Sequence, residues 1–385
     1  MTRVLVVGGG IIGTAHAHEA VERGFDVVHF EANPETREAS VRSLGTLSFS
    51  AASPGLDLEL SMKADLAWQR MLGPSTNTTT GQPVLRRTGS LTVATDAEEW
   101  ATLEKLAASA DADLRSWSLL GREESEKTSA ALQGQFTGSL RSSLDAVLDP
   151  AAALSSLRRQ MEESGRYRFS AGTEIRDVES DGVVDYAGRV TKGDFVVLCP
   201  GSSFRLASSV LRQPSTLRPV RIQAVETGPP IRRIPIPMWD VTSLLAHGAD
   251  GGHAYRAVSP EEDGTQLRVK CIPRPNGNLL VGEVQEDEDP QRFDLRERPM
   301  TEVIRRLELI LGQELPAISR RWSGTVYEST DGRLWHRDDL DQSVVLVGGT
   351  DERGVTLAPS IAADTFDWLV DGIDSGATRP GAKHS

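Results

Sequence analysis

The chain has 385 residues, more than a single hydrophobic core of usual size, so we expect two domains and room for a large buried ligand. Its 42 basic and 55 acidic residues give a formal net charge of −13, which argues against nucleic acid and anionic lipid as partners. No apolar run is long enough to span a membrane and only Cys199 and Cys271 are present, so we expect a cytoplasmic protein without disulfides or a metal site.

The N-terminal segment has the pattern of a dinucleotide-binding unit. The continuous branched run at residues 4–7 predicts a buried parallel strand, and a glycine-rich turn at residues 8–13 follows it. A helix is expected next, with Gly24 as its left-handed cap. Residues 25–30 predict a second strand, which ends in Glu31.

Each conspicuous residue of this unit has a physical task. Gly8 permits the tight turn, Gly10 lets the backbone approach a pyrophosphate, and Gly13 lets the helix pack closely on the sheet. The helix N-terminus offers N–H groups and positive dipole to the phosphates. Glu31 can accept hydrogen bonds from ribose hydroxyls and would repel a 2′-phosphate, which disfavours NADP. The segment therefore predicts a bound dinucleotide.

Later parts of the chain alternate between strand and helix patterns. In chain order we expect a polar loop at 38–45, an amphipathic helix at 56–72, strands at 167–170, 173–178 and 193–201, branched strands at 220–225 and 267–272, and a helix at 301–311. The apolar strand at 193–201 is expected to rejoin the first sheet, whereas the branched runs predict an antiparallel sheet. The tail from residue 375, including 381–385, is expected to be flexible.

Four separated segments carry a family resemblance. They are residues 4–31, the strand with a Gly-Ser end at 194–203, Pro-Val-Arg-Ile-Gln at 219–223, and Gly-Gly-Thr-Asp-Glu-Arg-Gly-Val-Thr-Leu-Ala-Pro at 348–359. Together they resemble the D-amino-acid oxidase, glycine oxidase and sarcosine oxidase family of flavoenzymes over nearly the full length. The Ala-Ser-Val-Arg loop at 39–42 and Cys-Pro-Gly at 199–201 are most similar to a branch associated with aminophosphonate oxidation.

The resemblance implies an α/β fold, in which a Rossmann-like FAD-binding domain is interleaved with a substrate domain built on an antiparallel β-sheet. The FAD-binding domain is expected at 1–85, 148–219 and 322–380, and the substrate domain at 86–147 and 220–321. No internal repeat accompanies this organisation.

The resemblance also implies bound FAD. Attachment is expected to be non-covalent, because neither His nor Cys occurs between residues 32 and 60 and neither cysteine lies at 322–356. Backbone N–H groups at the start of the last helix would stabilise negative charge on the flavin. The expected cofactor contacts are Gly8, Gly10, Ile12, Gly13, Glu31, Ala32, Ser40, Arg42, Ser43, Leu44, Gly45, Ile175, Gly201, Gly349, Gly354, Val355 and Thr356.

The implied reaction oxidises the C–N bond of a small amine or amino acid. Hydride would pass to flavin N5, the imine product would be hydrolysed by water, and oxygen or another acceptor would reoxidise the flavin. Catalysis then requires no protein nucleophile and no metal.

Substrate recognition departs from the family pattern. Amino-acid-oxidising members bind the carboxylate with an arginine in a Trp-x-Gly-x-Arg-Pro segment, and this chain has Val326 at that place. Arg353 is the first candidate for an anion contact and Arg42 the second, while Lys270 is a candidate for assisting oxygen activation. The alternative for all three is a solvated surface side chain, which we favour for Arg42 and Lys270.

Three other functions stay open. The first is a flavin dehydrogenase that oxidises the C–O bond of a 2-hydroxy acid or polyol phosphate. The second is a non-catalytic flavin-binding module. The third is an NAD dehydrogenase, although a further βα repeat would then be expected where the polar loop stands.

Overall fold

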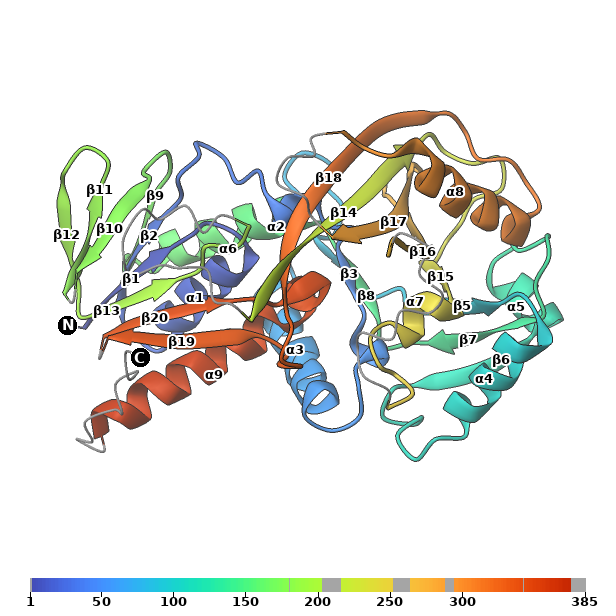
Figure 1. Ribbon diagram of the computed structural model, residues 1–385, viewed down its shortest axis with the longest axis horizontal. Helices are drawn as coiled ribbons and strands as arrows, with labels where there is room; N and C mark the ends of the chain where they lie inside the picture. The colour runs from blue at the N-terminus through green and yellow to red at the C-terminus, as the bar shows by residue number, and fades with distance from the viewer. Residues whose placement is uncertain are drawn as a thin grey trace.

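The computed structural model describes residues 2–179, 181–202, 216–251, 264–287, 294–341 and 343–374. The described chain forms two lobes, each built around its own β-sheet (Figure 1). The tail predicted to be flexible, residues 375–385, lies outside the described residues.

The first lobe contains a sheet that we call the parallel sheet. Within the described residues its spatial order is β19 (His336–Asp341), β20 (Val344–Gly348), β13 (Phe195–Leu198), β1 (Arg3–Val7), β2 (Asp26–Phe30) and β9 (Tyr167–Ser170). All its pairings are parallel except β19 with β20. The strand predicted at 193–201 does rejoin the first sheet, because β13 lies beside β1.

The β1–α1–β2 unit follows the predicted pattern. Helix α1 (Ile11–Glu22) begins after the glycine turn and ends just before Gly24. Gly24 has a φ of 84°, a left-handed conformation that glycine adopts without the steric cost of a Cβ atom. Strand β1 has its alternating side chains buried on both faces, as expected for a central parallel strand.

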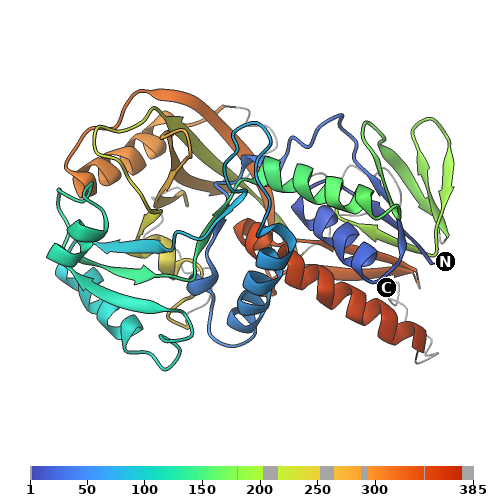
Figure 2. The ribbon, with the colours of Figure 1, turned by 180° about the vertical axis from the view of Figure 1, so that it is seen from behind.

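The parallel sheet is the middle of three layers. On one face α1, α6 (Pro150–Glu163) and α9 (Gly354–Asp374) lie side by side (Figure 2). The other face packs against a three-stranded antiparallel meander of β10 (Ile175–Glu179), β11 (Gly182–Asp185) and β12 (Val190–Lys192). Val4 and Val6 point to the helices, and Leu5 and Val7 point to the meander. Period-two alternation in β1 therefore serves two separate cores.

The second lobe contains the large antiparallel sheet. In the described chain its order is β18 (Ile318–Ser329), β14 (Leu217–Thr227), β17 (Leu279–Asp287), β16 (Gln266–Pro273), β15 (Met238–Asp240), β5 (Ser90–Ala94), β7 (Gly138–Ser142) and β6 (Trp117–Gly121). Among the described strands of this sheet, β15 and β5 are the one pair that runs in parallel. The branched runs predicted as strands lie in β14 and β16, so the predicted antiparallel sheet is confirmed.

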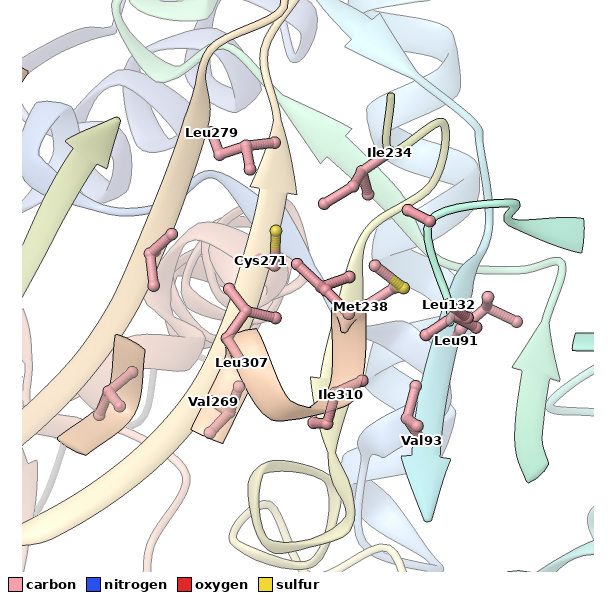
Figure 3. Close-up of a cluster of buried hydrophobic side chains, with 14 of the residues drawn as sticks. Leu91, Val93, Leu132, Ile234, Met238, Val269, Cys271, Leu279, Leu307 and Ile310 are labelled. Atoms are coloured by element: carbon pink, nitrogen blue, oxygen red, sulfur yellow. The ribbon is translucent and has the colours of Figure 1, made fainter. Parts of the chain in front are cut away.

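Helix α8 (Glu297–Leu311) covers one face of the antiparallel sheet. Figure 3 shows Leu307 and Ile310 of α8 packed with Val269 and Cys271 of β16. Because alternate residues of a strand point to opposite faces, Arg268 and Lys270 of β16 point away from this core. The polar face of β16 therefore faces the interior between the two lobes.

Helix α3 (Leu56–Leu72) has the predicted bounds and fixes the start of α9. Trp68 is fully buried, and its Nε1 donates to the carbonyl oxygens of Val355 at 3.2 Å and Thr356 at 3.1 Å. The loop predicted at 38–45 differs in one respect, since it contains the short helix α2 (Ala39–Arg42).

Small elements complete the described fold. They are β3 (Thr46–Leu47), η1 (Phe49–Ala51), β4 (Leu85–Arg86), α4 (Ala97–Ala107), α5 (Arg122–Thr128), β8 (Ala146–Leu148), α7 (Val241–Leu245) and η2 (Asp351–Arg353). The expected domain boundary at 321/322 falls inside β18, which pairs with β14 along its length. Among the described helices, none combines the length and apolar character needed to cross a membrane.

Candidate active site

A large cavity opens at the carboxyl ends of β1 and β2. We call it the nucleotide cavity, and it encloses about 1600 Å³, including space open to solvent. Gly8 and Gly10 from the turn, Glu31 and Ala32 after β2, and Ile175 of β10 all line it. Five of the predicted dinucleotide residues of the first forty positions, Gly8, Gly10, Glu31, Ala32 and Ser40, therefore meet at one place.

The glycines of the turn allow a packing that no larger residue fits. Gly8 has a φ of 115°, and a Cβ atom there would lie 2.1 Å from the carbonyl oxygen of Cys199. A Cβ atom at Gly13 would lie 1.9 Å from the carbonyl oxygen of Gly8. The backbone of the turn is thereby held between the end of β13 and α1, and Gly10, which caps the N-terminus of α1, lines the cavity.

Glu31 is positioned by backbone donors at the end of β2. Its carboxylate accepts from the N–H of Gly9 at 2.9 Å and from the N–H of Asn33 at 2.9 Å. Asn33 and Thr36 line the same cavity and were not predicted from the sequence. A carboxylate fixed at this distance from the glycine turn suits the ribose next to a pyrophosphate.

A second cavity, which we call the inner cavity, continues from the first toward the antiparallel sheet. It encloses about 1000 Å³, again including open space. Both cavities are lined by Ala39, Ser40, Cys199, Gly201 and Thr325, so they form one continuous groove. The groove has a polar outer part and an inner part walled by both lobes.

The inner cavity collects most of the remaining predicted residues. Ile12 of α1 and Gly354 and Val355 of α9 form its floor on the first lobe. From the predicted set, the residues that line one or both cavities are Gly8, Gly10, Ile12, Glu31, Ala32, Ser40, Arg42, Ser43, Leu44, Gly45, Ile175, Gly201, Gly349, Gly354 and Val355. Gly13 and Thr356 do not line either cavity, since Gly13 packs α1 on the turn and Thr356 is buried beside Trp68.

Arg42 lines the inner cavity but its guanidinium is already engaged. Nε donates to the carbonyl oxygen of Arg37 at 2.7 Å, and Nη1 donates to that of Ser323 at 2.8 Å. The side chain thus links α2 to β18 across the two lobes. The side chain is 38% exposed, so the solvated surface position favoured from the sequence describes Arg42 in part.

Arg353 is buried at 5% exposure and lines neither cavity. Nη2 donates to Ser61 Oγ at 2.7 Å and lies 2.9 Å from Asp57 Oδ1, an ion pair that is not aligned as a hydrogen bond. A surface position for Arg353 is therefore wrong. The placement also gives no support to an anion contact, because α3 already supplies the counter-charge.

Lys270 corrects the prediction of a surface lysine. It is 4% exposed on β16, and its Nζ lies 3.1 Å from Glu283 Oε1 and 2.7 Å from Glu352 Oε2. Arg268, two residues earlier on the same face, pairs with Glu352 and lies 3.5 Å from Glu283. We call Arg268, Lys270, Glu283, Glu352 and His247, whose Nε2 is 3.4 Å from Glu352, the charge cluster.

Two carboxyl groups of the charge cluster, Glu283 of β17 and Glu352 of η2, form part of the inner-cavity wall, as does Asp351. Burial raises the pKa of Glu283 to about 7, with Glu352 adding to the shift and Lys270 opposing it. Burial opposes ionisation of Glu352 too, but Arg268 and Lys270 outweigh it and hold its pKa well below the usual range. The pair therefore has one carboxylate that stays charged and one that titrates near neutrality.

Sequence reasoning did not identify Glu283 and Glu352 as site residues. The signal available was the alternation of charged residues in otherwise apolar strands, Arg268 and Lys270 in one and Glu283 and Gln285 in the next. In the described part of the chain, no group of three or more His, Cys, Asp or Glu side chains is arranged to hold a metal ion.

The residues present fit FAD. The glycine turn and Glu31 provide a place for an adenosine diphosphate, and the continuous inner cavity provides a wider, partly apolar place for a ring system. A Rossmann-like lobe with such a groove against an antiparallel substrate sheet defines a dinucleotide-dependent oxidoreductase.

Comparison with known proteins gives the family. The sequence matches the family model described as DAO, FAD dependent oxidoreductase, over residues 3–368, and the chain belongs to this family of FAD-dependent enzymes. The NAD dehydrogenase alternative is therefore not supported. No curated protein matches the chain in sequence.

Solved structures share the fold at low sequence identity. Glycine oxidase from Bacillus cereus superposes with a TM-score of 0.76 at 17% identity, covering 98% of this chain and 96% of that chain. L-proline dehydrogenase from P. horikoshii gives 0.74 at 19% identity, with 98% and 94% covered. L-alpha-glycerophosphate oxidase from Mycoplasma pneumoniae with FAD bound gives 0.73 at 18% identity, with 96% and 95% covered.

Proposed function

We propose that the protein oxidises the C–N bond of a small amine or amino acid. The observation that carries this choice is the chemistry of the inner cavity, where Glu283 and Glu352 are in the wall. A carboxylate can accept the proton that an ammonium group must lose before the carbon beside it is oxidised. Two of the three compared structures, glycine oxidase and L-proline dehydrogenase, have names that give amino acids as substrates.

The chain's own residues would bind and orient both reactants. Bound FAD supplies the hydride acceptor, and oxygen or another acceptor then reoxidises it. Glu31 and the glycine turn would hold the adenosine part, while Gly354 and Val355 open α9 at the inner cavity. A helix N-terminus there stabilises negative charge through its free N–H groups and dipole. The imine product is hydrolysed by water after release, without further help from the protein.

Non-covalent attachment of FAD remains a prediction. Cys199 lines both cavities, but it is buried and burial raises the pKa of its thiol far above the usual range. A neutral buried thiol is a poor nucleophile. Acid precipitation of the protein is expected to release all yellow colour into the supernatant, whereas colour in the pellet would show a covalent bond.

The competing proposal is oxidation of a C–O bond. It is favoured by the fold shared with a glycerophosphate oxidase. A 2-hydroxy acid or polyol phosphate, however, carries no cationic group to pair with Glu283 or Glu352 in the cavity wall, whereas an amine or amino acid does. The carboxyl groups of the wall therefore favour a substrate with an amino group.

An anaerobic screen tests the proposed function. Purified holoenzyme is mixed with amines, amino acids, aminophosphonates, 2-hydroxy acids and glycerol phosphate, and loss of flavin absorbance near 450 nm is followed. We expect C–N compounds to bleach the flavin and C–O compounds to leave it oxidised. Bleaching by glycerol phosphate or a hydroxy acid alone would replace the proposal, and bleaching by aminophosphonates alone would assign the aminophosphonate branch. If dithionite alone bleaches the flavin, a non-catalytic flavin-binding module is the better description.

A further inference from the structure

The glycine turn at the nucleotide cavity is held by side chains from α6, β2 and β9. We infer that Arg158 of α6 is a positioning residue for FAD, which orients the peptide between Gly9 and Gly10 for the diphosphate of the cofactor. Arg158 and Gly9 lie 149 residues apart in the chain. The inference rests on bound FAD and is independent of the bond that the enzyme oxidises.

Arg158 meets the turn at the carbonyl group of Gly9. Its Nη2 donates to this carbonyl oxygen and, at 2.9 Å, to Thr36 Oγ1. The hydroxyl of Thr36 in turn donates to the same carbonyl oxygen at 2.9 Å. The three groups form a closed triangle of hydrogen bonds, in which the carbonyl oxygen accepts twice. A carbonyl oxygen has two lone pairs, so the direction of this one is fixed by two donors.

The guanidinium group of Arg158 is itself held in place. It lies over the ring of Phe169 on β9, with Cζ 4.0 Å from the ring centroid. Tyr167 precedes Phe169 by two residues, so it lies on the same face of β9, beside Arg158. A flat cation that packs on an aromatic ring has little freedom to rotate, so the donor that meets Gly9 keeps its direction.

The preceding carbonyl group of the turn is held as well. His29 of β2 is fully buried, with Nε2 2.9 Å from the carbonyl oxygen of Gly8 and Nδ1 2.9 Å from the hydroxyl oxygen of Tyr167. Burial lowers the pKa of His29 to about 3, so the ring is neutral and has one donor and one acceptor. A carbonyl oxygen can only accept, so Nε2 donates to Gly8 and Nδ1 accepts from Tyr167. Two consecutive carbonyl groups of the turn are therefore fixed by side chains outside it.

These contacts determine where the N–H groups of the turn point. The peptide between Gly9 and Gly10 is trans and planar, so the N–H of Gly10 points opposite to the fixed carbonyl group of Gly9. The neighbouring N–H groups are occupied, because Gly9 donates to Glu31 and Ile11 donates to Ser40. The N–H of Gly10 has no acceptor among the described residues, and Gly10 lines the nucleotide cavity. It is a donor left for a ligand.

The diphosphate of FAD is the group that suits this donor. Free N–H groups at a helix N-terminus bind phosphate oxygens, and Gly10 caps α1. A donor that already has its direction loses little freedom when the ligand binds, so orientation in advance strengthens binding. Arg158 lines neither cavity, so it acts through the peptide and does not touch the cofactor.

The test compares pieces of the cofactor. Full-length protein is stripped of FAD, and the dissociation constants of FAD, ADP, adenosine and riboflavin are measured by titration calorimetry for wild type and Arg158→Met. ADP contains the diphosphate, whereas adenosine and riboflavin contain no phosphate. We expect Arg158→Met to weaken FAD and ADP by the same factor, about tenfold or more, which is the usual contribution of a hydrogen bond from a charged donor. Adenosine and riboflavin should bind as they do to the wild type.

The two phosphate-free ligands make the inference falsifiable. Equal weakening of riboflavin would mean that the variant loses the groove as a whole, so the role of Arg158 would be structural. Equal weakening of adenosine would mean that Arg158 supports the adenosine part of the cavity. Either result, or unchanged binding of all four ligands, would overturn the inference. Circular dichroism of each stripped protein establishes that it is folded.

Two further variants separate orientation from simple charge attraction. Arg159→Met is the matched control, because Arg159 is the next residue of α6, is exposed, and changes the net charge by the same amount. It should bind all four ligands like the wild type. Arg158→Lys keeps the charge but has no planar group to pack on Phe169 and to reach both oxygen atoms, so it should recover only a small part of the ADP affinity.

Salt provides an independent measurement. Attraction between separated charges is screened at high ionic strength, whereas an oriented N–H group keeps its direction. The ratio of the ADP dissociation constants of Arg158→Met and wild type should therefore stay the same between about 0.05 and 0.5 M salt. A ratio that falls to one at high salt, full recovery by Arg158→Lys, or an equal loss in Arg159→Met would show that charge alone attracts the diphosphate, and would overturn the positioning role.

Discussion

Arg353 is a residue whose sequence position suggested one role and whose contacts indicate another. It stands immediately before the glycine that begins α9, but its side chain turns to α3 and pairs with Asp57 and Ser61. Nη1 and Nε have no hydrogen-bond partner among the described residues. The ion pair therefore stabilises the fold, because Arg353 balances the negative charge of the buried Asp57 and links the start of α9 to α3.

Replacing Arg353 should accordingly lower stability more than substrate affinity. We expect Arg353→Met to cost about 3–5 kcal/mol of unfolding free energy, because it leaves the buried carboxylate of Asp57 uncompensated. Urea unfolding of the holoenzyme measures this loss. The double variant Arg353→Met/Asp57→Asn should recover much of it, since both charges are then removed. A loss below about 1 kcal/mol together with a large rise in the substrate dissociation constant would instead identify Arg353 as a substrate contact.

Residues whose role follows from backbone geometry could be predicted from the sequence, and residues whose role depends on distant partners could not. Gly8 and Gly13 act through the space that a missing Cβ leaves, which the local pattern alone indicates. Lys270 was assigned to the surface because a lysine in a strand is usually solvated. Its two partners lie 13 and 82 residues further along the chain, and no local pattern brings them together.

At the scale of elements, strands and helices with strong periodicity were located correctly. Helix α3 and strand β9 have the predicted bounds, and α8 extends only a few residues further toward the N-terminus. Helix α2 was expected as a loop because its four residues are too few to show a helical repeat. The way in which the two lobes pack against each other could not be predicted from the sequence, because the groove is lined by elements that lie hundreds of residues apart in the chain.

The contact between α1 and the glycine turn gives a prediction at this scale. Gly13→Ala improves intrinsic helix propensity by about 1 kcal/mol, but its Cβ would lie 1.9 Å from the carbonyl oxygen of Gly8. The clash dominates, because α1 must move off the turn that forms the nucleotide cavity. We expect at least tenfold weaker FAD binding, measured by flavin retained after dilution and gel filtration.

Gly121→Ala is the matched control for this change. A Cβ atom at Gly121 would lie 4.0 Å from its nearest neighbour, and the residue precedes α5 far from either cavity. The control should retain FAD like the wild type. Full FAD retention by Gly13→Ala would mean that α1 can shift without opening the cavity, contrary to the packing argument.

At the scale of the whole molecule, buried titrating groups set how stability depends on pH. Burial raises the pKa of Asp351, a residue that lines the inner cavity, to about 8, and burial raises that of Glu283 to about 7. Such groups stabilise the fold at low pH and lose that contribution as pH rises through the folded-state value. Burial lowers the pKa of His16 to about 4 and of His29 to about 3, so these residues destabilise the fold as pH falls through the unfolded value of about 6.5.

Between pH 7.5 and 8.5 the histidines are almost fully neutral in both states, so of this set only the raised carboxyl groups still change protonation. The folded protein then holds more protons than the unfolded chain, so the free energy of unfolding falls as pH rises. The slope is about 1.4 kcal/mol per pH unit for each proton that the folded state binds in excess of the unfolded state. Thermal unfolding of the holoenzyme with saturating FAD at constant ionic strength should show a falling midpoint across this window. In Glu283→Gln/Asp351→Asn the midpoint should be nearly constant there. A wild-type midpoint that does not fall from pH 7.5 to 8.5 would mean that both carboxyl groups are already ionised in the folded protein, so that burial does not raise their pKa values as described.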